Sequence, residues 1–159
     1  MFTPVIGTLG YVLSADRRRV LLVHRSRDGD QHRGKWNGLG GKLEAGEDVV
    51  ECLHRELREE AGITVTSQRL RGTISWPGFG GEAPEADWFG FIFVVDGYTG
   101  TPPEHNDDGP LAWHDLETLA ELPMWAGDRY WLPLVFGDGP VFHGVMPYLD
   151  GAPTGWSHH

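Results

Sequence analysis

Glu56, Glu59 and Glu60 place three carboxylates within one short stretch of the chain. On an ideal helix, which turns by about 100° per residue, they fall within an arc of roughly 100°. Like charges at these spacings repel, and the helix dipole disfavours negative charge in the last turn. A bound cation would offset both costs, and a hard divalent ion such as Mg²⁺ prefers oxygen ligands. The alternative is a solvated helix face supported by an Arg55–Glu59 pair at i, i+4.

The residues on either side favour metal binding. Gly46 precedes the expected helix, and Gly62 follows it in the position where a left-handed residue commonly ends a helix. Gly40 and Gly41 form a loop before the helix, and backbone carbonyls in such a loop can add oxygen ligands. The helix also has an apolar stripe that should pack on a core, made of Val49, Val50, Leu53, Leu57 and Ala61.

Gly41, Glu47 and the run Arg-Glu-Leu-Arg-Glu-Glu-Ala-Gly-Ile at residues 55–63 match every fixed position of the Nudix box. The chain therefore resembles the Nudix hydrolases. This resemblance implies a loop–helix–loop metal site that cleaves a nucleoside diphosphate linked to another group. The implied cofactor is Mg²⁺, with Mn²⁺ as the alternative. Its expected ligands are Gly41 through its carbonyl, Glu56, Glu59 and Glu60.

Residues 34–42, Gly-Lys-Trp-Asn-Gly-Leu-Gly-Gly-Lys, resemble the subgroup of this family that hydrolyses oxidised purine nucleoside triphosphates. In that subgroup the Asn of this run contacts the base, and we carry this role to Asn37. Lys42 and Arg25 are candidates for phosphate contact. The substrate implied by the resemblance is a small nucleotide.

Residues 124–131, Met-Trp-Ala-Gly-Asp-Arg-Tyr-Trp, resemble the base-recognition segment of the same subgroup. There a Trp stacks on the purine, which points to Trp125, and two adjacent aspartates read the edge of the base. Asp128 matches the second aspartate, whereas Gly127 stands where the first would be. Two adjacent carboxyls can share a proton, so this departure removes one of the two edge-reading groups. The alternatives are a core Trp at 125 and a helix N-cap at Asp128.

The loop at residues 100–108 supplies the last expected catalytic group. Asp108 best matches the acidic residue that approaches the metal in this subgroup, with Asp107 and Glu104 as alternatives. Either this residue or Glu59 is expected to orient or deprotonate the attacking water. A bidentate pair from Arg55 should fix the orientation of a glutamate. The expected catalytic set is Glu59, Glu56, Arg55 and Asp108.

The composition is that of a globular protein of 159 residues, with 40% hydrophobic and 23% charged residues. The net charge of −10 argues against broad binding to a nucleic-acid backbone. No stretch approaches the roughly 20 apolar residues of a membrane span, and no secretory signal is evident. Cys52 is the single cysteine, which fits a reducing, cytoplasmic location. A monomer and a homodimer both remain open.

Hydrophobic patterning predicts a single α/β domain over residues 1–159. Two strands and a polar loop precede the box helix, and three strands, a second helix and a last strand follow it. This order, like the resemblance, predicts an α/β/α sandwich around a mixed β-sheet. Strands are expected at 4–13, 20–24, 64–74, 88–95, 111–114 and 141–148, further helices at 116–122 and 128–136, and a loose tail at 150–159.

The expected reaction is attack of water on a phosphorus of a nucleoside triphosphate, which yields the monophosphate and pyrophosphate. With an oxidised purine as the base, this activity would cleanse the nucleotide pool. Rival substrates within the family are ADP-ribose or another ADP-sugar, a dinucleoside polyphosphate, and an ordinary nucleoside triphosphate. A rival of another class is a non-catalytic Nudix module that only binds a nucleotide.

Overall fold

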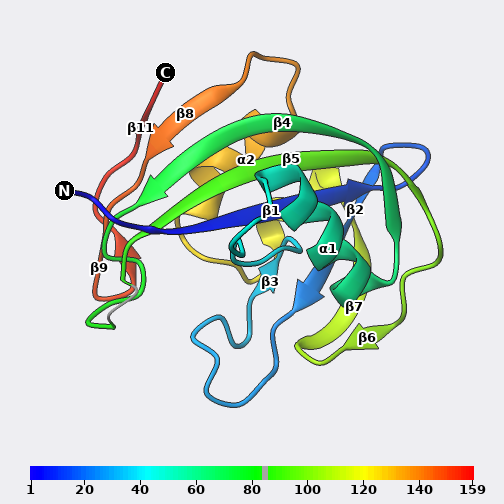
Figure 1. The fold of residues 1–159 in the computed structure, drawn as a ribbon, viewed down its shortest axis with the longest axis horizontal. Coiled ribbons are helices and arrows are strands. Elements are labelled where there is room, and N and C mark those ends of the chain that lie inside the picture. Colours follow the sequence, from blue (N-terminus) through cyan, green and yellow to red (C-terminus); the bar gives the residue numbers. More distant parts are fainter. Residues whose placement is uncertain (84–85) are drawn as a thin grey trace.

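The computed structural model describes residues 1–83 and 86–159. A long helix and a shorter one lie against a strongly twisted sheet (Figure 1). The strands are β1 (Val5–Leu13), β2 (Arg19–His24), β3 (Trp36–Asn37), β4 (Thr64–Trp76), β5 (Trp88–Thr99), β6 (His105–Asn106), β7 (Gly109–Asp115), β8 (Phe142–Val145), β9 (Tyr148–Leu149), β10 (Ala152–Pro153) and β11 (Ser157–His158). The helices are α1 (Val49–Ala61), the 3₁₀ helix η1 (Leu116–Glu121) and α2 (Asp128–Phe136).

The main sheet has the strand order β11-β8-β4-β5-β1-β2-β7-β6, with β3 paired to β2. The pairs β1–β5 and β4–β8 are parallel, whereas β4–β5, β1–β2 and β2–β7 are antiparallel, so the sheet is mixed. Successive residues of β1 point to opposite faces: Tyr11 and Leu13 belong to one core cluster, and Val12 belongs to the other. The sheet therefore carries a core on each face.

Helix α1 packs on one face because its sequence is amphipathic. Leu53 and Leu57 are fully buried against the sheet. Asp48 caps the first turn by accepting hydrogen bonds from the N–H groups of Val50 and Glu51, and the Glu51 side chain bonds back to the Asp48 N–H. Gly62 ends the helix in the left-handed conformation expected for this position, at φ 63°.

Helix α2 lies on the opposite face of the sheet, where Trp131 and Val135 are buried. A buried arginine, Arg71 of β4, holds the end of this helix. Its guanidinium donates hydrogen bonds to four carbonyls at or just beyond that end, those of Leu134, Val135, Gly137 and Gly139. A cation at a helix C-terminus is favoured by the helix dipole, and the four bonds tie this end of α2 to the sheet.

The expected fold class is confirmed: the chain is mixed α/β with a large mixed sheet and a helix on each face. The strand expected at 141–148 is interrupted, because Pro147 has no N–H to donate to a sheet. The helix expected at 116–122 is a 3₁₀ helix. Within the described residues, no helix is long and apolar enough to cross a membrane.

The prediction of a loose tail at residues 150–159 is wrong. Strand β11 pairs with β8, and the backbone groups of His143 and His159 exchange two hydrogen bonds of 3.0 and 3.1 Å. The reason is the contact between Trp156 and Gly144. A Cβ at Gly144 would lie 2.4 Å from the indole ring, so only glycine allows Trp156 to pack against this strand. Trp156 also meets Phe142 edge to face.

Candidate active site

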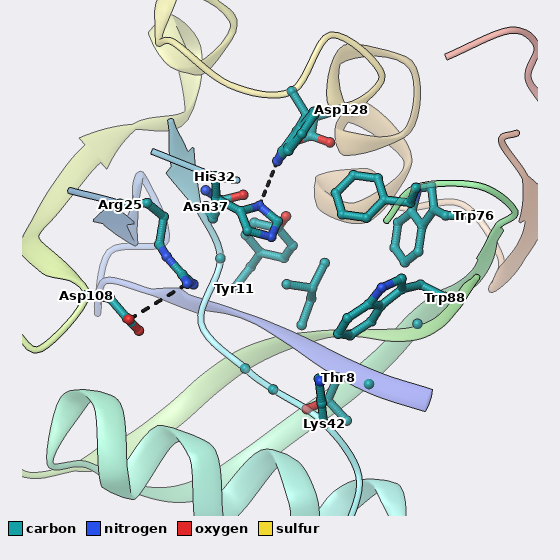
Figure 2. A pocket seen from close by; sticks show the side chains of 18 of the residues that line it. Thr8, Tyr11, Arg25, His32, Asn37, Lys42, Trp76, Trp88, Asp108 and Asp128 are labelled. Carbon is teal, nitrogen blue, oxygen red and sulfur yellow. Dashed lines mark hydrogen bonds and ion pairs between the residues drawn. The ribbon is translucent and has the colours of Figure 1, made fainter. Parts of the chain in front are cut away.

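A cavity of about 320 Å³ opens between β1, the loop that precedes α1, and the loop that precedes α2. Figure 2 shows polar and aromatic side chains from distant parts of the sequence pointing into it. Its lining includes eight of the residues expected from the sequence, namely Arg25, Asn37, Gly41, Lys42, Glu60, Asp108, Trp125 and Asp128. The rest of its lining is largely aromatic or glycine, including Tyr11, Trp76, Phe79, Trp88, Trp131 and Tyr148.

The Gly-Gly loop and α1 form one end of this cavity. The Glu60 carboxylate accepts a 2.9 Å hydrogen bond from the Gly40 N–H. Glu56 lies so close to Gly41 that a Cβ there would be 2.3 Å from Glu56 Oε1. The pKa of Glu60 is raised to about 8, mainly by burial, with smaller contributions from the neighbouring charges of Glu56 and Asp108 and an opposing one from the Gly40 hydrogen bond. The carboxyl groups of Glu56, Glu60 and Asp108 therefore lie close enough to influence one another, and Glu60 keeps its proton near neutral pH.

Arg55 organises the other carboxylates of the helix. Its guanidinium bonds both oxygens of Glu47, at 2.7 and 3.0 Å, and lies 2.7 Å from Glu56 and 3.4 Å from Glu59. It also donates to the Lys42 carbonyl. The pKa of Glu47 is lowered to about 2, chiefly by the hydrogen bonds from Arg55. The expected bidentate pair exists, but its partner is Glu47, so Arg55 fixes the loop to the helix and touches Glu56 with one nitrogen.

The fit to a divalent metal rests on the donor chemistry. Within residues 1–83 and 86–159, no three His, Cys, Asp or Glu side chains are gathered closely enough to hold an ion. Glu59 is largely exposed and lies in a second hollow of about 530 Å³ together with Arg58 and Asp107. However, Glu56 packs against Gly41 and Glu60 accepts a hydrogen bond from Gly40, so two carboxyl groups and the backbone carbonyls of this loop offer hard oxygen donors of the kind that a divalent cation prefers. The donor atoms are therefore of the type that such an ion binds. The complete set of metal ligands stays a prediction.

Asp108 connects the two hollows, since it lines both. It lies 3.7 Å from Arg25 and 3.9 Å from Arg27, and Arg25 is also held by Asp30 at 2.7 Å. Figure 2 shows Arg25 extending into the cavity toward Asp108. Among the three acidic residues considered in this loop, Asp108 alone reaches the main cavity.

Trp125 lies at the opposite end of the cavity. Its indole N–H donates a 2.7 Å hydrogen bond to Nδ1 of His32, and the Lys35 ammonium sits 4.3 Å from the ring centre. Phe79 packs at a tilt against the same ring, 4.8 Å away between centroids. Trp125 is only 9% exposed and belongs to the core cluster, so it lines the cavity and packs in the core at the same time.

Asp128 is the first residue of α2, and its carboxyl faces the cavity (Figure 2). The N-cap alternative is wrong, because the cap position is Gly127 and the helix begins at Asp128 itself. Burial raises the pKa of Asp128 to about 8, although the Arg129 and Lys35 charges oppose the rise. A neutral carboxyl can both donate and accept a hydrogen bond, which suits the edge of a nucleobase.

Asn37 and Lys42 line the cavity at different places. The Asn37 amide donates to the Lys35 carbonyl at 3.3 Å, which leaves its amide oxygen as an acceptor for a ligand. The Lys42 ammonium lies 5.5 Å from the centre of the Trp88 ring, at the end of the cavity near the Gly-Gly loop. A cation at this end suits a phosphate.

Several lining residues were not foreseen from the sequence. Thr8 and Tyr11 enter the site because β1 runs beside the Gly-Gly loop, with the Thr8 N–H bonded to the Gly41 carbonyl at 2.9 Å. His32 enters through its bond to Trp125. Tyr148 comes from the far end of the chain. No local motif marks these positions, because their place depends on strand pairing between distant segments.

Comparison with known proteins identifies the family of this chain. Residues 4–135 match the model of the NUDIX domain. The oxidized purine nucleoside triphosphate hydrolase of Danio rerio is 39% identical over 85% of this chain and 81% of its own length. An uncharacterized Nudix hydrolase of Bacillus subtilis, YvcI, is 36% identical over 86% of this chain and 83% of its own.

Solved structures give the same result. The mutator MutT protein of Bacillus halodurans superposes with a TM-score of 0.83 and is 31% identical, with 97% of each chain covered. The chain therefore belongs to the Nudix family and is a hydrolase of that family.

Proposed function

We propose that this protein is a cytoplasmic, divalent-metal-dependent pyrophosphohydrolase of purine nucleoside triphosphates, including oxidised ones. One observation carries the proposal: a single cavity joins an aromatic end, with Trp125 and Asp128, to an acidic end, with Glu60 and Asp108. A nucleoside triphosphate needs both ends, the aromatic one for its base and the acidic one for the metal ion that accompanies its polyphosphate. The similarity to the Danio rerio oxidized purine nucleoside triphosphate hydrolase supports the same substrate class.

The acidic end would hold the metal through Glu56, Glu59, Glu60 and the Gly41 carbonyl. When bound, a divalent cation supplies charge neutralisation for the phosphate oxygens. The remaining roles belong to the chain itself. Arg55 holds the loop that carries Gly41 and keeps Glu56 against it. Arg25 and Lys42 lie where they can contact the phosphates, Arg25 through its planar guanidinium and Lys42 as a point charge.

In the reaction, the oxygen of a water molecule attacks a phosphorus, and the anhydride P–O bond on the other side breaks. The products are the nucleoside monophosphate and pyrophosphate. A carboxylate, Asp108 or Glu59, takes the proton from the water. Asp108 reaches the main cavity, whereas Glu59 lies in the adjoining hollow. Single Asn and Gln substitutions at these two positions, compared at saturating substrate, would distinguish them.

At the aromatic end, Trp125 would stack on the base, while Asp128 and Asn37 would bond its edge. Base–aromatic stacking contributes about 1–3 kcal/mol per base in single-strand binding proteins. His32 and Phe79 fix the orientation of the Trp125 ring. The Lys35 ammonium covers one face of this ring. A base that stacks on that face would displace Lys35, whereas a base on the opposite face would leave it in place.

The test is a substrate panel assayed with Mg²⁺ and with Mn²⁺, with all phosphate products resolved. The panel holds the ordinary dNTPs and NTPs, 8-oxo-dGTP, 2-hydroxy-dATP, ADP-ribose and a diadenosine polyphosphate. We expect pyrophosphate release, with the highest kcat/KM for a purine triphosphate. If ADP-ribose or the diadenosine compound were the best substrate, the substrate class would be wrong although the hydrolase chemistry would stand. Binding without any hydrolysis would indicate a module that only recognises a nucleotide.

A further inference from the structure

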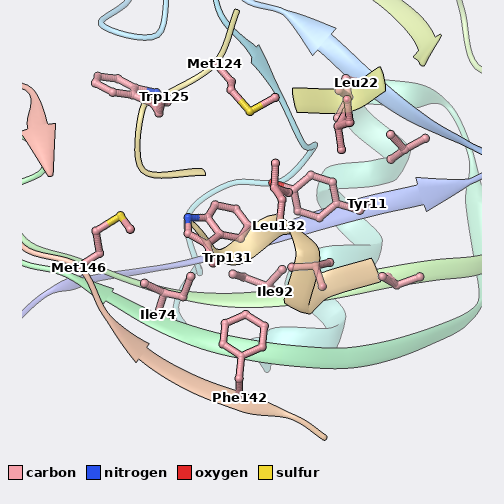
Figure 3. Packing of buried hydrophobic residues seen from close by; sticks show 14 of the residues in the cluster. Tyr11, Leu22, Ile74, Ile92, Met124, Trp125, Trp131, Leu132, Phe142 and Met146 are labelled. Atoms are coloured by element: carbon pink, nitrogen blue, oxygen red, sulfur yellow. The ribbon is translucent and has the colours of Figure 1, made fainter. Parts of the chain in front are cut away.

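Two side chains from the far end of the chain fill the space in which a side chain at position 127 would lie. A Cβ at Gly127 would lie 2.3 Å from the Met146 sulfur and 2.6 Å from the Tyr148 hydroxyl oxygen. Figure 3 shows Met146 near Trp131, across from Trp125. An acidic side chain at position 127 would therefore occupy space that these two residues fill. Glycine at position 127 therefore makes room for Met146 and Tyr148, and the Tyr148 hydroxyl lies where the second carboxyl would otherwise be.

Tyr148 is held rigidly in this position. Its N–H donates a 2.8 Å hydrogen bond to the Pro77 carbonyl, and its own carbonyl would be 2.5 Å from a Cβ at Gly78. Gly78 has a φ of 75°, so glycine is favoured there both by its conformation and by this close approach. The Tyr148 ring meets Phe79 edge to face at 5.0 Å. The glycine-rich turn after β4 therefore fixes the position of Tyr148.

The hydroxyl of Tyr148 retains its proton for a ligand. Its oxygen lies against Gly127, and its O–H can donate a hydrogen bond to a ligand. Burial raises the pKa of Tyr148 to about 12, with a smaller contribution from the Asp128 charge, so the phenol stays neutral at physiological pH. Unlike a carboxyl pair, this group cannot change from donor to acceptor by sharing a proton.

A second buried donor lies in the same wall. Trp131 is 1% exposed and lines the cavity, and its indole N–H has no hydrogen-bond partner among the described residues. In Figure 3 the nitrogen is on the side of the ring that faces away from Tyr11. A buried, unpaired donor is costly, so it favours a ligand that brings an acceptor. Tyr148 and Trp131 together make this wall rich in donors.

We propose that the Tyr148 hydroxyl is a specificity-determining group that takes the place of the missing carboxyl and selects purine nucleotides whose edge carries a carbonyl oxygen at C6. A 6-oxopurine presents an acceptor oxygen beside an N–H, whereas a 6-aminopurine presents an NH₂ donor that would oppose the donors of this wall. A neutral carboxyl at Asp128 complements the same oxygen and N–H pair. This inference rests on the proposed function, because it assumes that the aromatic end of the cavity holds the base.

The test compares the wild type with Tyr148→Phe, which keeps the ring and removes the hydroxyl. Tyr130→Phe is the matched control, since Tyr130 is 60% exposed. Two quantities are measured for each protein: the Kd values of dGMP and dAMP without metal, and the kcat/KM values of dGTP, 8-oxo-dGTP and dATP with Mg²⁺. Thermal unfolding of each protein verifies that it is folded at the assay temperature.

For Tyr148→Phe we expect the affinity for dGMP to fall at least about fivefold, with less than a twofold change for dAMP. The kcat/KM values should follow the same pattern, and Tyr130→Phe should behave like the wild type. An unchanged dGMP-to-dAMP ratio in Tyr148→Phe would overturn the inference. A wild type that binds these monophosphates selectively but releases no pyrophosphate would instead refute the proposed hydrolysis, so the two failures are distinguishable.

Discussion

The indole N–H of Trp125 donates a 2.7 Å hydrogen bond to Nδ1 of His32. This bond requires an unprotonated Nδ1, which places the ring proton of neutral His32 on Nε2. Burial and the nearby Arg25 charge lower the pKa of His32 to about 4, so the neutral form predominates down to acidic pH. The orientation of the expected stacking residue therefore depends on the protonation state of a histidine that the sequence did not mark.

His32 should make stability fall in acid. Its pKa is lowered on folding, so between pH 6.5 and about 4 the unfolded chain binds a proton that the folded chain does not. The His32 contribution to the free energy of unfolding is lost as pH falls through this window. Replacement of His32 by Gln keeps an acceptor for the Trp125 N–H and removes the group that titrates. Melting temperatures across pH 4–7 should decline less steeply for His32→Gln than for the wild type, and parallel curves would contradict the assignment.

Asp128 should have a pH effect of opposite direction. Its pKa is raised from 3.8 to about 8 on folding, so the folded chain keeps a proton that the unfolded chain loses between these values. The free energy of unfolding therefore decreases as pH rises from about 4 to 8, by at most about 1.4 kcal/mol per pH unit. Asp128→Asn should remove this component and gain stability relative to the wild type at pH 8. Replacement of exposed Asp138 by Asn is the matched control and should leave the slope unchanged.

Gly41→Ala should weaken metal binding with little loss of fold. A Cβ at this position would lie 2.3 Å from Glu56 Oε1, and the carboxylate, at the end of a flexible side chain, would have to move away. We expect the Mg²⁺ concentration for half-maximal activity to rise at least about tenfold. Gly155→Ala is the control, since a Cβ there meets nothing within 4 Å. An unchanged Mg²⁺ dependence would remove Glu56 from the metal site.

Much of the architecture could be predicted because it is encoded locally. The apolar stripe of α1 and Gly62 as its end depend on neighbours in sequence, and the structure has both as expected. The acidic end of the cavity follows from the same helix, with Glu60 and Gly41 meeting there. Arg55 was expected to pair with a carboxylate, but local reasoning did not identify Glu47 as its bidentate partner.

The aromatic end could be predicted only in part, because it is assembled from distant segments. Trp125 and Asp128 were found through resemblance, whereas Tyr148 depends on the turn at Pro77 and Gly78 and on the glycine at 127. The tail was misjudged for a similar reason. Its pairing is supported by contacts of Trp156 with Gly144 and Phe142, which lie on a distant strand and which no pattern within the tail reveals.

Trp125→Ala should weaken nucleotide binding if the base stacks on this ring. The loss of stacking corresponds to about 1–3 kcal/mol, and therefore to a five- to 150-fold increase in Kd for the nucleotide. Because Trp125 also packs in the core, the comparison must be made below the melting temperature of the variant. Trp113→Ala removes a Trp from the opposite side of the sheet, where it stacks with Tyr98, and should leave Kd unchanged. Equal Kd values for the wild type and Trp125→Ala would leave Trp125 with a packing role alone.

Glu59→Gln separates the metal-site prediction from a solvated helix face. Glu59 is 60% exposed and meets Arg55 at 3.4 Å, a geometry that by itself contributes little to stability. We therefore expect a melting temperature within a few degrees of the wild type and a fall in kcat of at least about a hundredfold, as expected for loss of a metal ligand or a general base. Glu51→Gln changes another exposed carboxylate of the same helix and should retain full activity, although it weakens the helix cap. Near-normal turnover in Glu59→Gln would return Glu59 to the solvated face, and Glu56 and Glu60 would then have to supply the metal ligands of the helix.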